Sequence, residues 1–324
     1  MKSAVIGSCL SNLTAARLSA DFGVEQTLCV HHNRSDSFVK YFIDRSAKMI
    51  DMEFLDNFLV DTDQFRVEAR RFLENQQSDT VGYFQLQDRR REGVDVFAEL
   101  AEEPLDIILI DNFMDISAKL MQSTRPEWAN SPLFLNPGFY GNPDEIVENF
   151  KFTEFLTAKE SAENQNRIVQ FIRQLQPKAK IFFLCFQYST SEESPERMAR
   201  AHAFYDEFKK VVAPDIYLIP PLDLPADLQM PGDWTHFENP RVYKAIAGYI
   251  FLTTQANLPR IGDDYRIPPC PGDETHLVEH PPFERQTAVA GAAVVGGKGS
   301  AGHIGLRSIV RRVKRALVST LAKR

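Results

Sequence analysis

The chain has 324 residues, 44% of them hydrophobic, which is enough to form a large buried core. Its formal net charge of -7 argues against general nucleic-acid binding. The four cysteines form no Cys-x-x-Cys pair, which excludes zinc-ribbon and thioredoxin-type motifs and favours reduced, mostly buried thiols.

Short apolar runs alternate with helical patterns over the first 258 residues. The runs that predict buried strands cover residues 3–6, 25–30, 106–110, 180–186 and 215–219. The patterns that predict helices cover residues 13–22, 64–75, 94–102, 152–175, 195–211 and 240–254. This alternation predicts an α/β domain over residues 1–258, with a three-layer α/β/α, doubly wound, flavodoxin-like arrangement around a five-stranded parallel sheet.

The pattern changes after residue 258. Six prolines between positions 259 and 282, followed by a stretch rich in Ala, Val and Gly, predict an extended wrap and a flexible linker over residues 259–302. Residues 303–324 combine apolar positions at helical spacing with seven basic and no acidic residues after position 305. This composition predicts a basic amphipathic helix, suited to peripheral membrane contact or to a protein surface through residues 306–324.

The start of the chain predicts a location. A short strand and a polar turn stand where a signal peptide would have a long apolar segment, and no stretch approaches the roughly 20 apolar residues of a membrane-spanning helix. We therefore expect a cytoplasmic protein, peripheral at the inner face of the membrane if the basic helix binds lipid.

Polar residues follow three of the predicted strands. Gly7-Ser8-Cys9-Leu10 comes after the first strand and Asp111-Asn112 after the third, while Asp233-Trp234-Thr235-His236 lies in the predicted loop after the fifth. Ligands of doubly wound sheets bind at the carboxyl ends of the strands, so these residues are expected to meet there. They supply a nucleophile, a base and a base-orienting carboxylate, the parts needed for acyl transfer.

The three blocks resemble those of the SGNH, or GDSL-like, hydrolase superfamily, over about residues 1–255. The Gly-Ser-Cys form of the first block is similar to superfamily members from bacterial capsule and surface-polysaccharide pathways. The resemblance implies an acyl-ester hydrolase or an O-acyl(acetyl)transferase acting on a carbohydrate. It implies no cofactor for hydrolysis, and acetyl-coenzyme A as the acyl donor for transfer.

The first block departs from the family at the nucleophile. Aligned on Gly7 and Leu10, the family's serine falls on Cys9 and its aspartate on Ser8. The register and the higher nucleophilicity of a thiol favour Cys9, whereas the family's oxygen chemistry favours Ser8. Both residues are therefore candidate nucleophiles.

The remaining roles follow from the other two blocks. His236 is the candidate base, and Asp233 would fix its tautomer and stabilise its charged form. The Asn112 side-chain amide and backbone N–H groups around Gly7 and Cys9 are the candidate donors to an oxyanion.

Further candidate contacts stand close to these blocks. Asp111 precedes Asn112, and His32 and Arg34 follow the second strand, where they would line the substrate pocket. Arg34 suits a carboxylate, a phosphate or a sugar acid. We predict no metal site, because the adjacent His31 and His32 cannot easily face one ion.

Two other interpretations remain open at this point. The Gly-Ser-Cys turn would, in the first, only cap a helix that begins near Ser11. In the second, the chain is a non-catalytic SGNH-like scaffold that binds polysaccharide or a biosynthetic partner.

Overall fold

The computed structural model describes most of the first 256 residues. The described residues are 1–31, 33–59, 63–78, 80–81, 84–86, 89–91, 94–134, 143–186, 188–189, 195–224, 228–230, 233–237 and 240–256. All the described residues lie within one compact unit, Met1–Gly291. The predicted wrap, linker and basic helix, with Cys270, lie outside the described residues, so the boundaries at 258 and 302 stay predictions.

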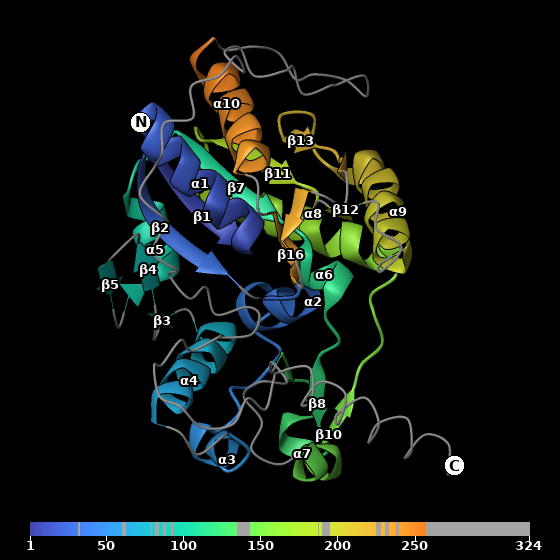
Figure 1. Ribbon diagram of the computed structural model, residues 1–324. Coiled ribbons are helices and arrows are strands. Elements are labelled where there is room, and N and C mark those ends of the chain that lie inside the picture. Colours follow the sequence, from blue (N-terminus) through green and yellow to red (C-terminus); the bar gives the residue numbers. More distant parts are fainter. Residues whose placement is uncertain are drawn as a thin grey trace, which may run out of the picture. The chain divides into compact units, whose positions relative to one another are not determined.

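Along the chain, at least one helix separates each strand of the central sheet from the next (Figure 1). The helical elements are α1 (Cys9–Phe22), α2 (Ser35–Phe38), the π-helical turn η1 (Val39–Ile43), α3 (Met52–Asp56), α4 (Asp63–Gln77), α5 (Val96–Glu102), α6 (Phe113–Ser117), the 3₁₀ turn η2 (Pro126–Trp128), α7 (Pro143–Asn149), α8 (Ala158–Leu175), α9 (Pro195–Val211) and α10 (Arg241–Gln255). The strands are β1 (Lys2–Gly7), β2 (Glu25–His31), β3 (Thr80–Val81), β4 (Phe84–Leu86), β5 (Arg89–Arg91), β6 (Val94–Asp95), β7 (Ile107–Asp111), β8 (Met121–Ser123), β9 (Pro132–Leu133), β10 (Phe150–Phe152), β11 (Lys180–Leu184), β12 (Tyr188–Ser189), β13 (Tyr217–Ile219), β14 (Asp223–Leu224), β15 (Gln229–Met230) and β16 (Asp233–Phe237).

Five of these strands form the central sheet. Its order is β13-β11-β7-β1-β2, and every neighbouring pair is parallel. All five residues of β7, at the centre, are buried, as expected for a parallel strand covered on both faces. The predicted fold class and the five predicted strands are therefore confirmed, with small shifts at the strand ends.

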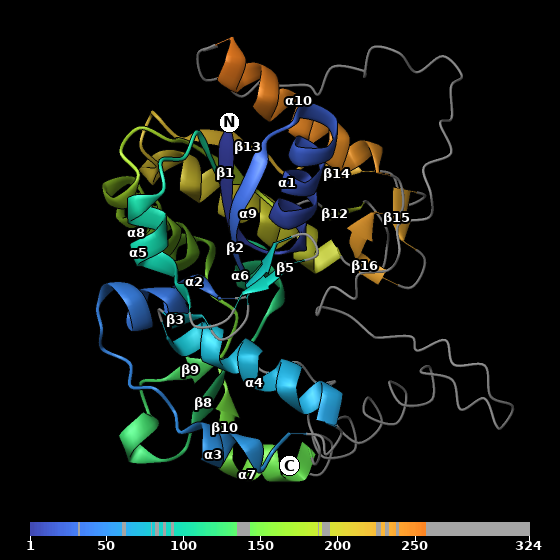
Figure 2. The ribbon, with the colours of Figure 1, turned by 90° about the vertical axis from the view of Figure 1, so that its left-hand side faces the viewer.

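Helices cover both faces of this sheet (Figure 2). Successive side chains of β11 point to opposite faces: the ring of Phe182 stacks on Tyr217 with centroids 4.7 Å apart, and Phe183 packs on Phe208 of α9 at 4.5 Å. α10 packs against α1 on the other face, where the rings of Phe22 and Phe251 stack at 4.6 Å. The arrangement is a three-layer α/β/α fold.

Two long connections leave the central sheet and bind each other. The first connection (residues 33–95) runs from β2 to α5, and the second connection (residues 118–157) runs from α6 to α8. The second contains a small antiparallel sheet in the order β10-β8-β9, which is absent from the sequence predictions. Gln76 of α4 exchanges two hydrogen bonds with the backbone of Phe134, at 2.7 and 2.8 Å. Ser37 donates to the Pro132 carbonyl at 3.1 Å.

The start of α8 differs from the prediction. The helix begins at Ala158 and not at residue 152, because Thr157 and Glu160 form a capping box. The Thr157 hydroxyl accepts from the Glu160 N–H at 3.2 Å, and the Glu160 carboxylate accepts from the Thr157 N–H at 2.9 Å. Residues 150–152 form strand β10 instead.

No helix among the described residues is long and apolar enough to cross a membrane.

The capping box of α8 gives a pH-dependent prediction. Replacing Thr157 with alanine should lower the free energy of unfolding by about 1 kcal/mol at neutral pH. Hydrogen bonds from Thr157 lower the pKa of the Glu160 carboxyl. The stabilisation is therefore present above the unfolded-state pKa and is lost as the pH falls through the folded-state pKa. Urea unfolding should show the difference between wild type and Thr157→Ala shrinking from about pH 7 to about pH 3.

A matched control comes from α10. The Thr254 hydroxyl donates to the Ile250 carbonyl at 2.8 Å, with no carboxyl group in the pair. Thr254→Ala should change stability by an amount that does not vary over the same pH range. An equal pH dependence in both variants would contradict the role of Glu160.

Candidate functional site

The carboxylate of Asp111 joins the carboxyl ends of β7 and β1. Its Oδ2 atom accepts from the Ser8 N–H at 2.7 Å, the Ser8 hydroxyl at 2.9 Å and the Ser11 hydroxyl at 2.6 Å. Its Oδ1 atom accepts from the Phe113 N–H at 3.1 Å, at the start of α6. Burial raises the pKa of this carboxyl, and the hydrogen bonds from Ser11 and Ser8 oppose that shift. Asp111, predicted as a pocket residue, thus anchors the first turns of two helices.

Gly7 makes room for this carboxylate. A Cβ atom at position 7 would lie 2.6 Å from Asp111 Oδ2 and 2.9 Å from the Ser11 hydroxyl oxygen. A glycine is therefore required here because of the close approach of a side chain from the neighbouring strand.

Ser8 and Cys9 have different environments. Ser8 is 1% exposed and is the N-cap of α1, accepting from the Leu10 N–H at 3.3 Å while its hydroxyl donates to Asp111. The helix thus begins at Cys9, two residues earlier than the capping interpretation expected, but with Ser8 in a capping role. Cys9 is 6% exposed at the first helical position, directly after the sheet edge.

Asn112 holds a buried amide in an uncommon arrangement. It is the N-cap of α6, yet its side chain makes no capping hydrogen bond. Its Oδ1 atom instead accepts from the Phe186 N–H at 2.7 Å, just past the end of β11. Its Nδ2 atom is buried and has no hydrogen-bond partner among the described residues. Since an unsatisfied buried donor costs roughly 1–3 kcal/mol, this amide favours an acceptor beside it, either a water molecule or a bound group.

His236 lies in a strand and not in the predicted loop. β16 pairs with β15 and packs against β12, which follows β11 beyond Phe186 (Figure 2). The Phe237 N–H donates to the Tyr243 hydroxyl at 3.1 Å, which ties β16 to α10. The His236 ring is half-buried, with its Nε2 atom enclosed. The backbone of Asp233 opens the same strand, and its side chain is outside what the structure describes.

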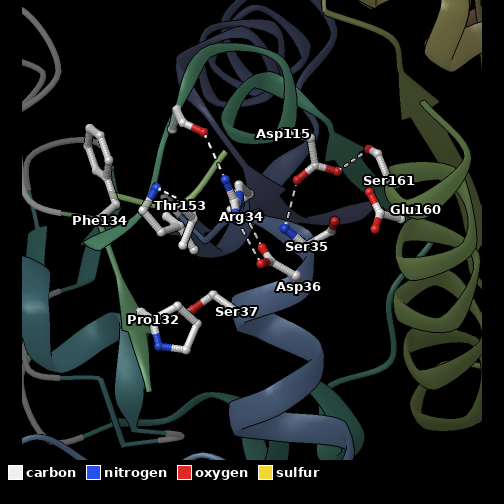
Figure 3. A network of polar contacts seen from close by, with 12 residues as sticks. Arg34, Ser35, Asp36, Ser37, Asp115, Pro132, Phe134, Thr153, Glu160 and Ser161 are labelled. Carbon is white, nitrogen blue, oxygen red and sulfur yellow. Dashed lines mark hydrogen bonds and ion pairs between the residues drawn. The ribbon is translucent and has the colours of Figure 1, made fainter. Parts of the chain in front are cut away.

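Arg34 does not line an open pocket as predicted. It is 2% exposed, and its Nε and Nη2 atoms bind the two carboxylate oxygens of Asp36 at 2.7 and 2.8 Å (Figure 3). Its Nη1 atom donates to the carbonyls of Ala118 at 3.2 Å and Glu154 at 2.9 Å. The guanidinium therefore joins the two long connections. Arg34 was predicted to contact a ligand because it follows β2. His32, which also follows β2, lies outside the described residues.

Asp115, which is not among the predicted site residues, anchors a second buried network. Its Oδ1 atom accepts from the Ser35 N–H at 2.7 Å (Figure 3). Its Oδ2 atom accepts from the Ser161 hydroxyl and from Gln165 Nε2, the latter at 3.0 Å. Burial raises the pKa of this carboxyl, against the hydrogen bonds from Ser161 and Ser35. In the sequence, Asp115 can be recognised as a second acidic residue four positions after Asp111, which ends β7.

The other described cysteines, Cys29 and Cys185, are buried as predicted and form no disulfide among the described residues. Burial raises the pKa of Cys29 to about 12, helped by the nearby charge of Asp111, and raises that of Cys185. Within the described part of the chain, no three His, Cys, Asp or Glu side chains are grouped so as to hold a metal ion.

Comparisons with known proteins give only distant similarities. No family model matches the chain, and no curated protein matches its sequence. Similar solved structures include the acetyl xylan esterase Est2A from the rumen bacterium Butyrivibrio proteoclasticus, with a TM-score of 0.35 and 9% identity over 79% of this chain and 64% of that one. A carbohydrate esterase family 2 enzyme with a carbohydrate-binding domain, from Corynascus thermopiles (Myceliophthora fergusii), gives 0.38 and 10% over 79% and 65%.

A third structure is a carbohydrate esterase whose active site is described as having divergent catalytic and non-catalytic binding functions. It gives a TM-score of 0.35 and 9% identity over 79% of this chain and 64% of that one. The chain spans less than two thirds of the length of all three proteins. These three neighbours are carbohydrate esterases, and similarity at this level does not transfer their activity to this chain.

The crowding at Gly7 gives a stability prediction with an internal control. Gly7→Ala should lower the free energy of unfolding by about 2 kcal/mol, because Asp111 or the β1–α1 turn must move. Gly248→Ala in α10 places its Cβ 3.7 Å from the Phe22 ring, an ordinary contact. It should raise stability by up to about 1 kcal/mol through helix propensity. Urea unfolding measures both changes, and equal stability of the two variants would show that position 7 tolerates a methyl group.

Proposed function

We propose that this chain catalyses acyl transfer from an ester, with the Asn112 amide as a donor to the oxyanion. The buried Nδ2 atom of Asn112 carries the proposal, since a fixed amide donor held away from water is what a developing oxyanion requires. Asn112 follows Asp111 in the chain, and Cys9 follows Ser8. The Ser8 hydroxyl donates a hydrogen bond to the Asp111 carboxylate. The donor and the thiol therefore lie at the same edge of the sheet.

Cys9 is the proposed nucleophile. The Ser8 hydroxyl is used in capping α1 and in the bond to Asp111, whose Oδ2 atom also accepts from the Ser11 hydroxyl. The Cys9 sulfur would attack the ester carbonyl carbon and form a C–S bond, and its proton would pass to His236. The C–O bond to the alcohol then breaks, and His236 returns the proton to the departing alkoxide.

The thioester formed in this way reacts with a second acceptor. A water molecule or a hydroxyl group attacks the carbonyl carbon, the C–S bond breaks, and the acceptor's proton returns to Cys9 through His236. Asp233 would orient the His236 ring. Water as acceptor gives a hydrolase that needs no cofactor. A sugar hydroxyl gives an O-acetyltransferase. With acetyl-coenzyme A as the donor, the bond broken in the first step would be its C–S bond, and His236 would return the proton to the departing coenzyme A thiolate.

The substrate class in this proposal is a carbohydrate ester. It is supported by the resemblance of the Gly7-Ser8-Cys9, Asp111-Asn112 and Asp233–His236 blocks to the SGNH superfamily. A role in capsule or surface-polysaccharide synthesis and a cytoplasmic location are further parts of the proposal.

Removing the Asn112 amide tests the oxyanion role. Asn112→Ala should lower kcat for p-nitrophenyl acetate by about 10²- to 10³-fold with a small change in KM, because the donor acts mainly on the transition state. Asn57→Ala removes an exposed amide that bonds only backbone carbonyls of α3 among the described residues, and should leave kcat unchanged. An unchanged kcat in a folded Asn112→Ala would overturn the proposed role.

Three further variants identify the nucleophile and the base. Cys9→Ala and His236→Ala should each reduce turnover to near background, because each removes a group that forms or breaks a bond. Ser8→Ala should retain kcat within a few-fold while losing about 1 kcal/mol of stability with its cap. Cys29→Ala, which removes a buried thiol from β2, is the control. Activity lost in Ser8→Ala and kept in Cys9→Ala would reverse the assignment.

The wild-type protein tests the proposal as a whole. If it turns over neither simple esters nor acetyl-coenzyme A with sugar acceptors, the result would favour a binding scaffold.

A further inference from the structure

The position of Asn112 depends on a helix too short to be stable alone. α6 has five residues, and an isolated helix of this length does not form in water. The Asn112 carbonyl accepts from the N–H groups of Asp115 at 3.1 Å and Ile116 at 3.4 Å, so Asn112 is part of the first turn of α6. Whatever holds α6 in place also holds the Asn112 side chain.

Asp115 connects α6 to two other elements. One carboxylate oxygen binds the Ser35 N–H at the start of α2, and the other binds Ser161 and Gln165 of α8 (Figure 3). These three partners lie outside α6 and far from it along the chain, Ser35 before it and the other two after it. The carboxylate is 3% exposed, so water does not compete for these bonds.

Two arginines hold the other end of α6. Arg34 Nη1 donates to the Ala118 carbonyl at 3.2 Å, and Arg200 Nε donates to the Ile116 carbonyl at 3.0 Å. These carbonyls belong to the last turn, where a short helix leaves its acceptors unsatisfied. Cations at this end also interact favourably with the helix dipole.

We propose that Asp115 is a positioning residue for the candidate site, which holds α6 so that Asn112 keeps its amide pointed at the reacting group. Arg34 and Arg200 support it from the opposite end of the helix. The structural half of this inference stands on the geometry of α6; the kinetic half rests on the proposed function of Asn112.

Amide hydrogen exchange tests the structural half without any substrate. Asp115→Asn keeps the shape of the side chain but replaces one of its two acceptor oxygens with an NH₂ group. The donors that bind that oxygen in the wild type then lose their acceptor. The Phe186 N–H, which donates to Asn112 Oδ1, should then exchange roughly tenfold faster relative to amides of β1 and β2. Ser161→Ala, a milder variant that removes one donor, should give a smaller change in the same direction.

A second buried network supplies the control for general loss of stability. Gln176 accepts from the Leu105 N–H at 3.3 Å and donates to the Glu103 carbonyl at 2.7 Å, at the opposite end of α8. Gln176→Ala removes comparable buried bonds and should not accelerate Phe186 selectively. If Phe186 exchanges at the wild-type relative rate in Asp115→Asn, the proposal is overturned.

A double-mutant cycle tests the kinetic half. Asp115→Asn should lower kcat about tenfold with KM unchanged, and should lower it no further in an Asn112→Ala background. If the two losses multiply, Asp115 does not act through Asn112 and the inference is overturned. Faster exchange at Phe186 with wild-type kcat would support the positioning of Asn112 and count against its catalytic role, which separates the two proposals.

Discussion

The carboxylate of Asp111 fixes the starts of α1 and α6 at once. It accepts hydrogen bonds from the backbone and side chains of the β1–α1 turn through one oxygen and from the first turn of α6 through the other. Taking a carboxylate out of water costs several kcal/mol, so the burial is tolerated only because these donors surround it. The same carboxylate occupies the space that a side chain at position 7 would need, so only glycine fits there.

Three polar residues predicted to touch substrate have structural partners instead. Asp111 and Ser8 bind each other, and Arg34 binds Asp36 and two carbonyls. Asn112 also lacks the capping role that an asparagine usually has at this position of a helix, because its Oδ1 atom accepts from the Phe186 N–H instead. The chemistry proposed for this edge therefore depends on the residues beside the anchors, Cys9 and Asn112.

The central sheet was predictable because each of its strands is a short apolar run with buried neighbours on both faces. The small sheet was not, because β8, β9 and β10 have two or three residues each, too few to show a period. The start of α8 has a capping-box sequence, Thr157-x-x-Glu160, which marks where the helix begins. The prediction followed the apolar periodicity instead and placed the start too early. The role of Arg34 could not be read, since its carbonyl partners lie 84 and 120 residues further along the chain.

The bonds between the two long connections have a consequence for how such a chain can change. The Gln76 side chain forms hydrogen bonds with the N–H and C=O groups of Phe134, and the Ser37 hydroxyl donates to the Pro132 carbonyl. Each connection thus provides hydrogen-bond partners for the other. Deleting one would remove these hydrogen-bond partners and expose apolar rings of its neighbour to water, such as Phe134 and Phe150, which pack on Phe72 and Phe58. A minimal version of this domain, natural or engineered, must therefore lose both segments together or keep both.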